Sequence, residues 1–484
     1  MRICILGSGT AGFVTALILK NTYPNYEIDI ISSSDVGIIG VGEGSTEHWA
    51  KFIDYCGIHP HEIIKHCGAT FKSGIMFKGW GSRDYLQGVE GSLVGAHNDT
   101  PMAYAKLIGE DCDPIDLVAH TTWNSEVPFN KFIDISPEEM PVTQYHFNTR
   151  ELNTFLSDKC TQIGISQYDD KINEVVLDRG GVDKLIGNSE YNYDFYIDCT
   201  GFSRLLIGKL GAEWQSYGQY LMMKRAIVFP TGDEAEYPYW TLAQAMKYGW
   251  MFRIPVWGRK GNGYIFDSDY ITDEEAKAEV EEYLGHTVDI AKTISFDPGA
   301  LDKTWIQNVC AIGLSASFVE PLEASSIGTS IQQAFLLASR LHKYNQTTID
   351  RYNEEVNAIL ENIRDFVLLH YMCDRDDTNF WINARSVELP ESLKNNLEIW
   401  KNKLPISEDF NKSTTKVLFN EYNHAIVLHG LGLFDTNSIN EQFQNFPNSV
   451  KEYANRTVHN LRETEANIKT IPHKMMIDLI RKLC

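Results

Sequence analysis

The sequence predicts an α/β protein, and three observations support this fold class. A glycine-rich turn follows a short apolar strand and precedes an apolar helix within residues 2–23. Residues 160–200, 219–230 and 250–267 alternate apolar and polar side chains, as half-buried strands do. From Ile349 onward the pattern is mostly helical. We therefore expect one large α/β domain with an added, mainly helical module.

The same patterns predict where these two parts divide. We place the α/β domain at residues 1–345, with an insertion at about 81–140 that lacks clear periodicity, and the helical module at residues 346–484. Asn and Lys are dense at 394–412, which predicts a connector there. A helical pattern is also expected after Ser268.

The composition argues against several kinds of partner. Lys and Arg number 43 and Asp and Glu 65, so the formal charge of −22 disfavours nucleic acid and anionic membranes. No stretch of about 18 apolar residues is present, so no membrane span is expected. Nine cysteines are scattered without a CxxC pair, and no signal-peptide pattern precedes the first strand. These features predict a reducing, cytoplasmic location.

The glycine-rich turn at residues 7–12 reads GSGTAG, a GxGxxG motif between a strand and a helix. This context is the one that a dinucleotide-binding turn requires. The first Gly permits the tight turn, the second lets the backbone approach a pyrophosphate, and the third packs helix on strand. A ribose-binding acid is expected about twenty residues later. After the predicted strand Tyr26–Ile31 that position is Ser32, and Asp35 is the nearest acid.

The segment VCAIGLSASFVEPLEASSIG, residues 309–328, holds a second candidate site. It starts as a strand at Val309–Ile312, breaks at Gly313 and leads into a helical pattern after Ile327. Small residues let the backbone approach a flat ligand, and a helix start offers N–H groups to an anion. Glu323 is a candidate general base there. An ordinary strand–turn–helix, with a Glu favoured by the helix dipole, explains the same residues.

Several motifs in one order resemble those of the flavin-dependent tryptophan halogenase family. The resemblance runs from residue 3 to about residue 435. The matching motifs are GSGTAG (7–12), GVGEGST (40–46), ATFK (69–72), FKGW (77–80), HF (146–147), DCTG (198–201), GWMFRIP (249–255), IGLSASFVEPLEASSIG (312–328) and RDDTNFW (375–381).

The resemblance implies a fold, an activity and cofactors. The fold is the FAD-binding, Rossmann-like flavin monooxygenase fold, with the helical module covering the substrate site. The enzyme would use FAD as FADH2, O2 and a halide ion (chloride, bromide or iodide) to make hypohalous acid, which halogenates a small aromatic substrate. A separate NAD(P)H-dependent flavin reductase would supply FADH2, in agreement with the single GxGxxG motif. Assembly into a homo-oligomer is left open.

The resemblance also implies roles for individual residues. Lys72 matches the lysine that holds or carries the electrophilic halogen, and Glu323 matches the catalytic glutamate. Ser325 and Ser326 stand where the family has Thr-Gly at its halide site. The expected FAD-binding residues are Gly7, Gly9, Thr10, Ala11, Gly12, Ser32, Gly40, Val41, Gly42, Glu43, Gly313, Leu314 and Ile327.

The sequence departs from the family in the substrate-binding segments. Phe252 replaces the second Trp of the WxWxIP motif, and Phe419 aligns with a Trp that clamps the amino acid. The aromatic, histidine-containing segment that sandwiches tryptophan is not evident at 81–105, where Asp84-Tyr85-Leu86 is the closest remnant. We therefore expect a phenol- or indole-like substrate other than free tryptophan, with Phe419 as a candidate contact.

Two other functions remain open from the sequence. A flavin-dependent aromatic monooxygenase, a hydroxylase of the same fold, would not need Lys72 and would accept electrons directly from NAD(P)H. A non-catalytic flavin-fold protein would not need Lys72 and Glu323 together. His59, His61, His66 and Cys67 are close in sequence, but their spacing is not that of a regular zinc motif, so no metal is expected.

Overall fold

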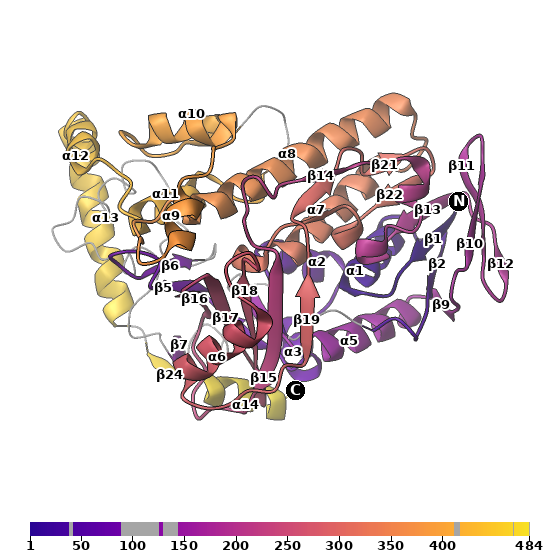
Figure 1. Cartoon of the computed structure of the whole chain (residues 1–484), viewed down its shortest axis with the longest axis horizontal. Helices are drawn as coiled ribbons and strands as arrows, with labels where there is room; N and C mark the ends of the chain where they lie inside the picture. The colour runs from indigo at the N-terminus through magenta and orange to yellow at the C-terminus, as the bar shows by residue number, and fades with distance from the viewer. Residues whose placement is uncertain (38–41, 89–124, 129–143, 411–416, 468, 484) are drawn as a thin grey trace. The chain divides into compact units, whose positions relative to one another are not determined.

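The structure, a computed structural model, describes residues 1–37, 42–88, 125–128, 144–410, 417–467 and 469–483. The chain forms two compact units, each assembled from three separate segments (Figure 1). Unit 1 comprises Met1–Ala69, Phe147–Gly218 and Asp297–Glu361, and unit 2 comprises Thr70–His146, Gln219–Phe296 and Asn362–Cys484. The sequence-based division assigns FAD binding to residues 1–345 and coverage of the substrate site to residues 346–484. The two compact units do not test these functions, so the division stays a prediction.

A six-stranded sheet with the strand order β21-β22-β13-β1-β2-β9 forms the centre of unit 1. The pairs from β22 to β9 are parallel, and only the edge strand β21 is antiparallel. The sheet strands are β1 (Arg2–Leu6), β2 (Glu27–Ser32), β9 (Ser166–Asp169), β13 (Phe195–Asp198), β21 (Trp305–Ile306) and β22 (Val309–Ala311). The strands predicted at residues 2–6, 26–31 and 309–312 are therefore β1, β2 and β22.

The helices of unit 1 bury apolar faces, and α1 contacts both α5 and α7. In α1 every residue from Gly12 to Leu19 is buried, which explains its nearly continuous apolar run. The helices are α1 (Thr10–Thr22), α2 (His48–Tyr55), α3 (Pro60–His66), α5 (Thr149–Gln162), α7 (Ser325–Arg340) and α8 (Gln346–His370), which continues into unit 2. Because α5 ends at Gln162, the strands predicted over 160–200 begin only at Ser166.

Unit 1 also contains two three-stranded sheets, β10-β11-β12 and β14-β20-β23. Their strands, with the short β3, are β3 (Glu43–Gly44), β10 (Glu174–Asp178), β11 (Gly181–Ile186), β12 (Glu190–Tyr191), β14 (Trp214–Ser216), β20 (Gly299–Leu301) and β23 (Ser317–Phe318). The turn expected between Asp178 and Gly181 joins β10 to β11.

A seven-stranded sheet with the order β19-β15-β18-β17-β16-β5-β6 forms the core of unit 2. Only the β16–β5 pair is parallel. Phe252 of β17 lies opposite Gly263 of β18, where an added Cβ would stand 2.4 Å from Cζ of the Phe252 ring. The aromatic residue that replaces the second Trp of WxWxIP therefore packs on a glycine of the neighbouring strand.

The strands and helices of unit 2 have the following bounds, with α6 between β18 and β19 and β24 between α13 and α14. The strands are β4 (Thr70–Lys72), β5 (Gly74–Lys78), β6 (Tyr85–Gly88), β7 (Glu126–Pro128), β8 (Gln144–Phe147), β15 (Arg225–Thr231), β16 (Thr241–Met246), β17 (Gly249–Val256), β18 (Arg259–Phe266), β19 (Lys292–Ser295) and β24 (Thr470–Pro472). The helices are α6 (Asp273–Leu284), α9 (Asn379–Arg385), α10 (Glu391–Trp400), α11 (Glu421–Gly430), α12 (Thr436–Gln444), α13 (Asn448–Ala466) and α14 (His473–Leu483).

The connector predicted at 394–412 is wrong for its first part, which is the helix α10. Leu393 and Trp400 are buried seven residues apart, so one face of α10 is anchored although Asn and Lys dominate its composition. Of the insertion predicted at 81–140, the described parts include β6 and β7, which pair with β5 and β24. Among the described helices, none is long and apolar enough to cross a membrane.

Candidate active site

The GxGxxG turn of unit 1 has a different structural reason for each glycine. Gly7 has φ +118°, and a Cβ there would lie 2.3 Å from the carbonyl oxygen of Cys199. A Cβ on Gly12 would lie 2.1 Å from the carbonyl oxygen of Gly7. A Cβ on Gly9, in contrast, would meet no atom within 4 Å. Packing of the chain therefore requires Gly7 and Gly12, whereas Gly9 lies at an open position that a ligand can approach.

No side chain caps the first turn of α1. Its N-cap, Gly9, offers no side-chain hydrogen bond, and the first turn holds no acidic residue. Backbone N–H groups of a first helical turn have no partner within the helix and suit a phosphate. Thr10, the first helical residue, donates from Oγ1 to Oδ1 of Asn153 at 3.1 Å.

An acidic residue of another strand, Asp169, lies beside Ser32. The register of β2 and β9 pairs Ser32 with Asp169. Oδ1 of Asp169 accepts a hydrogen bond from the Ser34 N–H at 2.9 Å, and this bond lowers the carboxyl pKa. Asp169 was not predicted, because β2 and β9 are far apart in sequence. Asp35, the nearest acid along the chain, is exposed.

The second glycine-rich segment is described from Gly42 onward, so the predicted residues Gly40 and Val41 lie outside the described residues. Burial raises the pKa of the Glu43 carboxyl to about 7. Thr46, three residues later, lies against Gly328 of α7, where a Cβ would stand 2.2 Å from the Thr46 Oγ1. This segment therefore packs directly on α7.

The loop at Gly313 joins two of the predicted FAD-binding segments. Gly313 has φ +71°, and a Cβ there would lie 2.7 Å from the Cβ of Ala11 in α1. Its N–H donates to Oε1 of the buried Gln333 at 3.0 Å, so this N–H is not available to a ligand. Leu314 follows in the same short helical turn, Gly313–Ser315.

Asp198 of the DCTG motif organises the loops around this point. Its buried carboxylate accepts hydrogen bonds from the N–H groups of Leu206 at 2.8 Å and Ile207 at 2.9 Å. It also accepts from Thr200, through both N–H and hydroxyl, and from Oγ of Ser315. Asp198 therefore holds the turn after β13 against the loop of Gly313, and its carboxylate is occupied by protein donors.

Glu323 and the two predicted halide-binding serines lie at the start of α7. Glu323 is buried and ends a short helical turn at Pro321–Glu323. Ala324 then adopts a left-handed conformation as the N-cap of α7 and supplies no side-chain hydrogen bond. Ser325 is buried and Ser326 exposed, and their N–H groups belong to the first turn. An uncapped helix start of this kind suits an anion. Ile327, the last predicted FAD contact, is buried in the same turn.

Lys72 lies in unit 2, where it ends β4 and is buried to 98%, with 2% of its surface exposed. Burial of a lysine is unusual and is a reason to look for a function. Strand β4 pairs with β8, so Thr70 lies opposite His146 and Lys72 opposite Gln144. Because alternate residues share a sheet face, Lys72, Thr70 and His146 lie on one face.

His146 is held neutral and in one tautomer. Burial, and then the charge of Lys72, lower its pKa well below the usual value. The Thr70 hydroxyl donates its only hydrogen to the carbonyl of Pro255 at 2.6 Å, so Nδ1 of His146 must donate to Thr70 at 3.0 Å. Nε2 then accepts from the hydroxyl of Thr241 at 2.9 Å. The surroundings of Lys72 therefore include an imidazole that is uncharged and fully hydrogen-bonded.

Phe419, the predicted substrate contact, is buried in unit 2. Its ring stacks on Phe366 with centroids 4.1 Å apart, and its backbone exchanges two hydrogen bonds with the side chain of Asn362. His424 packs on Phe366 as well, and burial lowers its pKa to about 4. The role of Phe419 in substrate binding stays a prediction.

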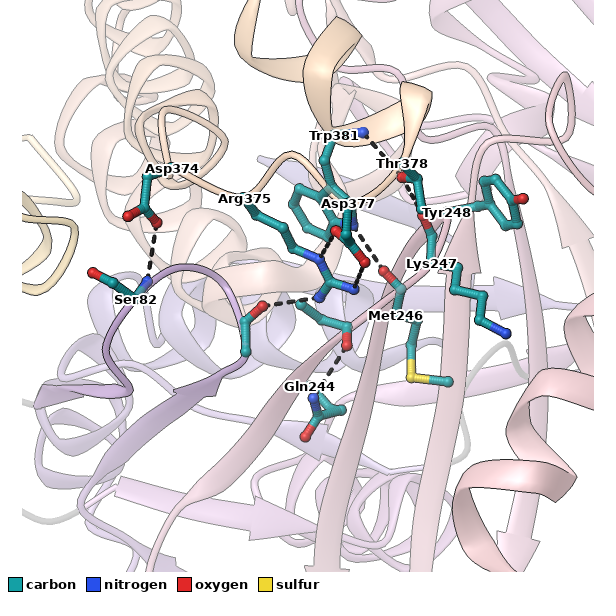
Figure 2. Close-up of polar contacts among 12 residues, drawn as sticks. Ser82, Gln244, Met246, Lys247, Tyr248, Asp374, Arg375, Asp377, Thr378 and Trp381 are labelled. Carbon is teal, nitrogen blue, oxygen red and sulfur yellow. Dashed lines mark hydrogen bonds and ion pairs between the residues drawn. The ribbon is translucent and has the colours of Figure 1, made fainter.

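The RDDTNFW motif has a structural role within unit 2 (Figure 2). The Arg375 guanidinium forms a two-pronged ion pair with Asp377, donates to the carbonyl of Gly79 at 2.9 Å and lies 4.9 Å from the ring centre of Trp381. The Trp381 indole N–H donates to the carbonyl of Met246 at 2.8 Å. The motif therefore fastens the start of α9 to the β5–β6 turn and to the end of β16.

The histidine-rich segment at residues 59–67 caps a helix. Nδ1 of His59 accepts from the His61 N–H, and the His59 N–H donates to Glu62, so the pair forms a capping box for α3. Within the described ranges, no group of three or more His, Cys, Asp or Glu side chains is arranged to hold a metal ion.

In sum for unit 1, the structure brings together Ala11 with Gly313, the 42–46 segment with α7, and Glu323 with Ser325. Lys72 and Phe419 belong to unit 2 and are described there. The sequence did not predict Asn153 or Asp169. Each is identified only by a hydrogen bond to a residue more than a hundred positions earlier, Thr10 and Ser34 respectively.

Comparison with known proteins gives consistent matches over the whole chain. A family model described as tryptophan halogenase matches residues 2–445. Tryptophan 6-halogenase SttH from Streptomyces toxytricini is 29% identical over 448 residues, which cover 84% of this chain and 85% of that protein.

Solved structures match over the full length of the chain. The tryptophan halogenase from Shewanella frigidimarina has a TM-score of 0.89 at 27% identity, covering 100% of this chain and 98% of that one. Xcc4156, a flavin-dependent halogenase from Xanthomonas campestris, has a TM-score of 0.85 at 25% identity, covering 100% and 98%. These superpositions confirm the predicted α/β, Rossmann-like flavin fold with its helical module.

Proposed function

Because the chain belongs to the tryptophan halogenase family, we propose that it halogenates a phenol- or indole-like substrate other than free tryptophan. Members of this family are flavin-dependent halogenases, so the chain is an enzyme that uses reduced FAD, O2 and a halide ion. The family also requires a separate flavin reductase and an aromatic substrate.

The residues of unit 1 fit FAD. Gly9 leaves open space, and the first turn of α1 has N–H groups that no side chain caps. When bound, reduced FAD supplies two electrons, and the arene with its halide supplies two more, so that O2 is reduced to two waters. The balance is ArH + X⁻ + FADH2 + O2 + H⁺ → ArX + FAD + 2 H2O.

The protein residues then have separate tasks. The N–H groups of Ser325 and Ser326 bind the halide at the start of α7. Lys72 holds the electrophilic halogen as a buried hydrogen-bond donor. Glu323 orients that oxidant and takes the proton that leaves the ring after attack. These assignments rest on motif matches and on the burial of both side chains.

Substrate choice rests on one observation, the position of Tyr85. This residue, in the remnant of the tryptophan-sandwiching segment, is fully buried, and its ring stacks on Phe77 with centroids 4.7 Å apart. Its hydroxyl lies 2.6 Å from Nδ1 of His370. A ring and hydroxyl that are both engaged in the core are not available to hold an amino acid.

One assay tests the proposal. The purified protein, a flavin reductase, NADH, FAD and either chloride, bromide or iodide are mixed with a panel of phenols, indoles and L-tryptophan, and products are identified by mass spectrometry. We expect halogenated phenols or indoles, and none without the reductase. Tryptophan as the best substrate would contradict the proposed specificity. Rapid reduction of bound FAD by NADH alone, measured by stopped flow, would contradict the need for a reductase.

A further inference from the structure

Asn153 of α5 has an unusual environment in unit 1. The side chain is buried, with 3% of the residue exposed. Its Oδ1 accepts the hydrogen bond from Thr10, the first residue of α1. Its Nδ2 has no hydrogen-bond partner among the residues that the structure describes. A buried amide donor without a hydrogen-bond partner is destabilising. Such a donor therefore indicates a ligand that accepts its hydrogen bond.

A second polar group lies on the same face of α5. Thr149 precedes Asn153 by four residues, and residues four apart in a helix share a face. Thr149 is also buried, and its Oγ1 has no hydrogen-bond partner within the described part of the chain. Helix α5 packs against α1. Two unpaired polar groups thus lie on one face of a helix that contacts the helix of the GxGxxG turn.

The neighbouring elements identify the ligand. In a GxGxxG turn, the pyrophosphate of a dinucleotide lies beside the second glycine and the first turn of the helix. Here Gly9 borders open space, and Thr10 holds the carbonyl end of Asn153, which leaves the NH2 group as the free donor. A donor is the group that suits a phosphate oxygen.

We propose that Asn153 is a further FAD-binding residue, whose side-chain NH2 donates a hydrogen bond to the pyrophosphate, with Thr149 on the same face. This inference rests on the proposed FAD-dependent function. It adds a contact from Asn153, 143 residues beyond Thr10 of the motif, where sequence alone gives no sign of cofactor binding.

The test is the affinity for oxidised FAD, measured by fluorescence titration of the full-length protein and of three variants. Asn153→Ala removes the donor and should raise Kd about tenfold or more, as loss of a hydrogen bond to a charged group does. Asn153→Asp has nearly the same shape and can still accept the bond from Thr10. It replaces the donor by a negative charge, so its Kd should rise further than that of Asn153→Ala. Thr154→Ala, on the exposed side of α5, is the control and should bind as the parent does.

The outcomes separate the two proposals. If the parent protein binds no FAD, the proposed function fails. If the parent binds FAD and Asn153→Asp binds as tightly as Asn153→Ala or the parent, while melting at the parental temperature without FAD, the role of Asn153 at the pyrophosphate is wrong. The melting temperature of each FAD-free variant separates a loss of binding from a loss of folding.

Discussion

The two units bury ionisable side chains of different kinds. Among the described residues, the buried acidic and basic side chains of unit 1 are all carboxylic acids: Asp29, Asp170, Asp198, Glu320 and Glu323. Unit 2 buries the four histidines His146, His370, His424 and His473, together with Lys72, Lys260, Arg364, Asp267 and Asp365. Every buried histidine and every buried cationic side chain of the described residues is therefore in unit 2.

The buried groups of the two units also differ in their hydrogen-bond partners. Strand ends in unit 1 lead into turns rich in backbone N–H groups, which stabilise a carboxylate such as Asp198. In unit 2, the buried His146 is paired by the hydroxyls of two threonines, and the buried His473 accepts a hydrogen bond from the N–H of Phe71 in β4. Buried acids thus organise loops in unit 1, whereas unit 2 buries histidines and cationic side chains as well as acids.

The largest expected effect comes from removing the buried lysine. Lys72→Ala should abolish halogenated product while oxidation of reduced flavin by O2 continues, because in the proposed mechanism the lysine handles the electrophile and not the flavin. Product is measured by mass spectrometry and released oxidant by a peroxide assay. Lys78→Ala, which removes an exposed lysine of β5, is the matched control and should be active. Halogenation by Lys72→Ala at the parental rate would make Lys72 an ordinary buried side chain.

The next effect tests a buried acid of unit 1. Glu323→Gln keeps the shape but cannot take a proton, so product formation should fall about 10²–10⁴-fold, the usual contribution of a positioned base. FAD affinity should stay near the parental value, because Glu323 is not among the residues proposed to bind FAD. Single-turnover halogenation and FAD titration measure the two quantities. A large loss of FAD affinity would show that Glu323 supports the fold and not the chemistry.

A smaller effect, on stability, is expected at Asp198. Asp198→Ala leaves the buried N–H groups of Leu206 and Ile207 without an acceptor, which should lower the free energy of unfolding by about 3 kcal/mol or more. Urea denaturation gives that value, and hydrogen exchange should locate the loss at residues 200–207. Asp158→Ala, an exposed acid of α5, should change stability little. Equal unfolding curves for both variants would refute the organising role of Asp198.

The smallest effect per residue separates the units by pH. Burial lowers the pKa of His424 and His473 to about 4, so the unfolded chain binds protons below about pH 6.5 while the folded chain does not. Unit 2 should therefore lose about 2 kcal/mol per histidine between pH 6.5 and 5. Glu43, with a pKa raised to about 7, has the opposite sign, since the folded state binds its proton first and unit 1 gains stability over the same range.

Hydrogen exchange at pH 7 and pH 5, corrected for the intrinsic rates, measures both trends. His473→Asn should reduce the loss in unit 2, whereas His459→Ala, at an exposed position of α13, should not. If the stability of both units changed in the same direction between pH 7 and pH 5, the predicted contrast between the units would be wrong.

Local signals predicted much of the fold. The strand β1 and its glycine turn follow from an apolar run next to GxGxxG, and α8 follows from its periodicity. The helix α10 was missed because its anchors, Leu393 and Trp400, are few among Asn and Lys. The composition of α10 reflects the majority of its residues, which are not buried, whereas its packing depends on the two buried side chains.

For the candidate site, short motifs singled out Glu323 and Lys72, which the structure shows to be buried, and their roles stay predictions. It was not predicted where strands or helices from distant segments meet. Asp169 reaches Ser34 only through the pairing of β9 with β2, and Asn153 reaches Thr10 only through the packing of α5 on α1. Such residues follow no motif, because their neighbours are set by topology.

The hydrogen bonds around His146 have a consequence for proton movement. From Thr241 through His146 and Thr70 to Pro255, every hydrogen points in the same direction, and the series ends on a carbonyl that cannot donate. Such a row is not a relay, because reversing it would require a proton from that carbonyl. The row of hydrogen bonds beside Lys72 therefore offers no path along which a proton could pass through His146.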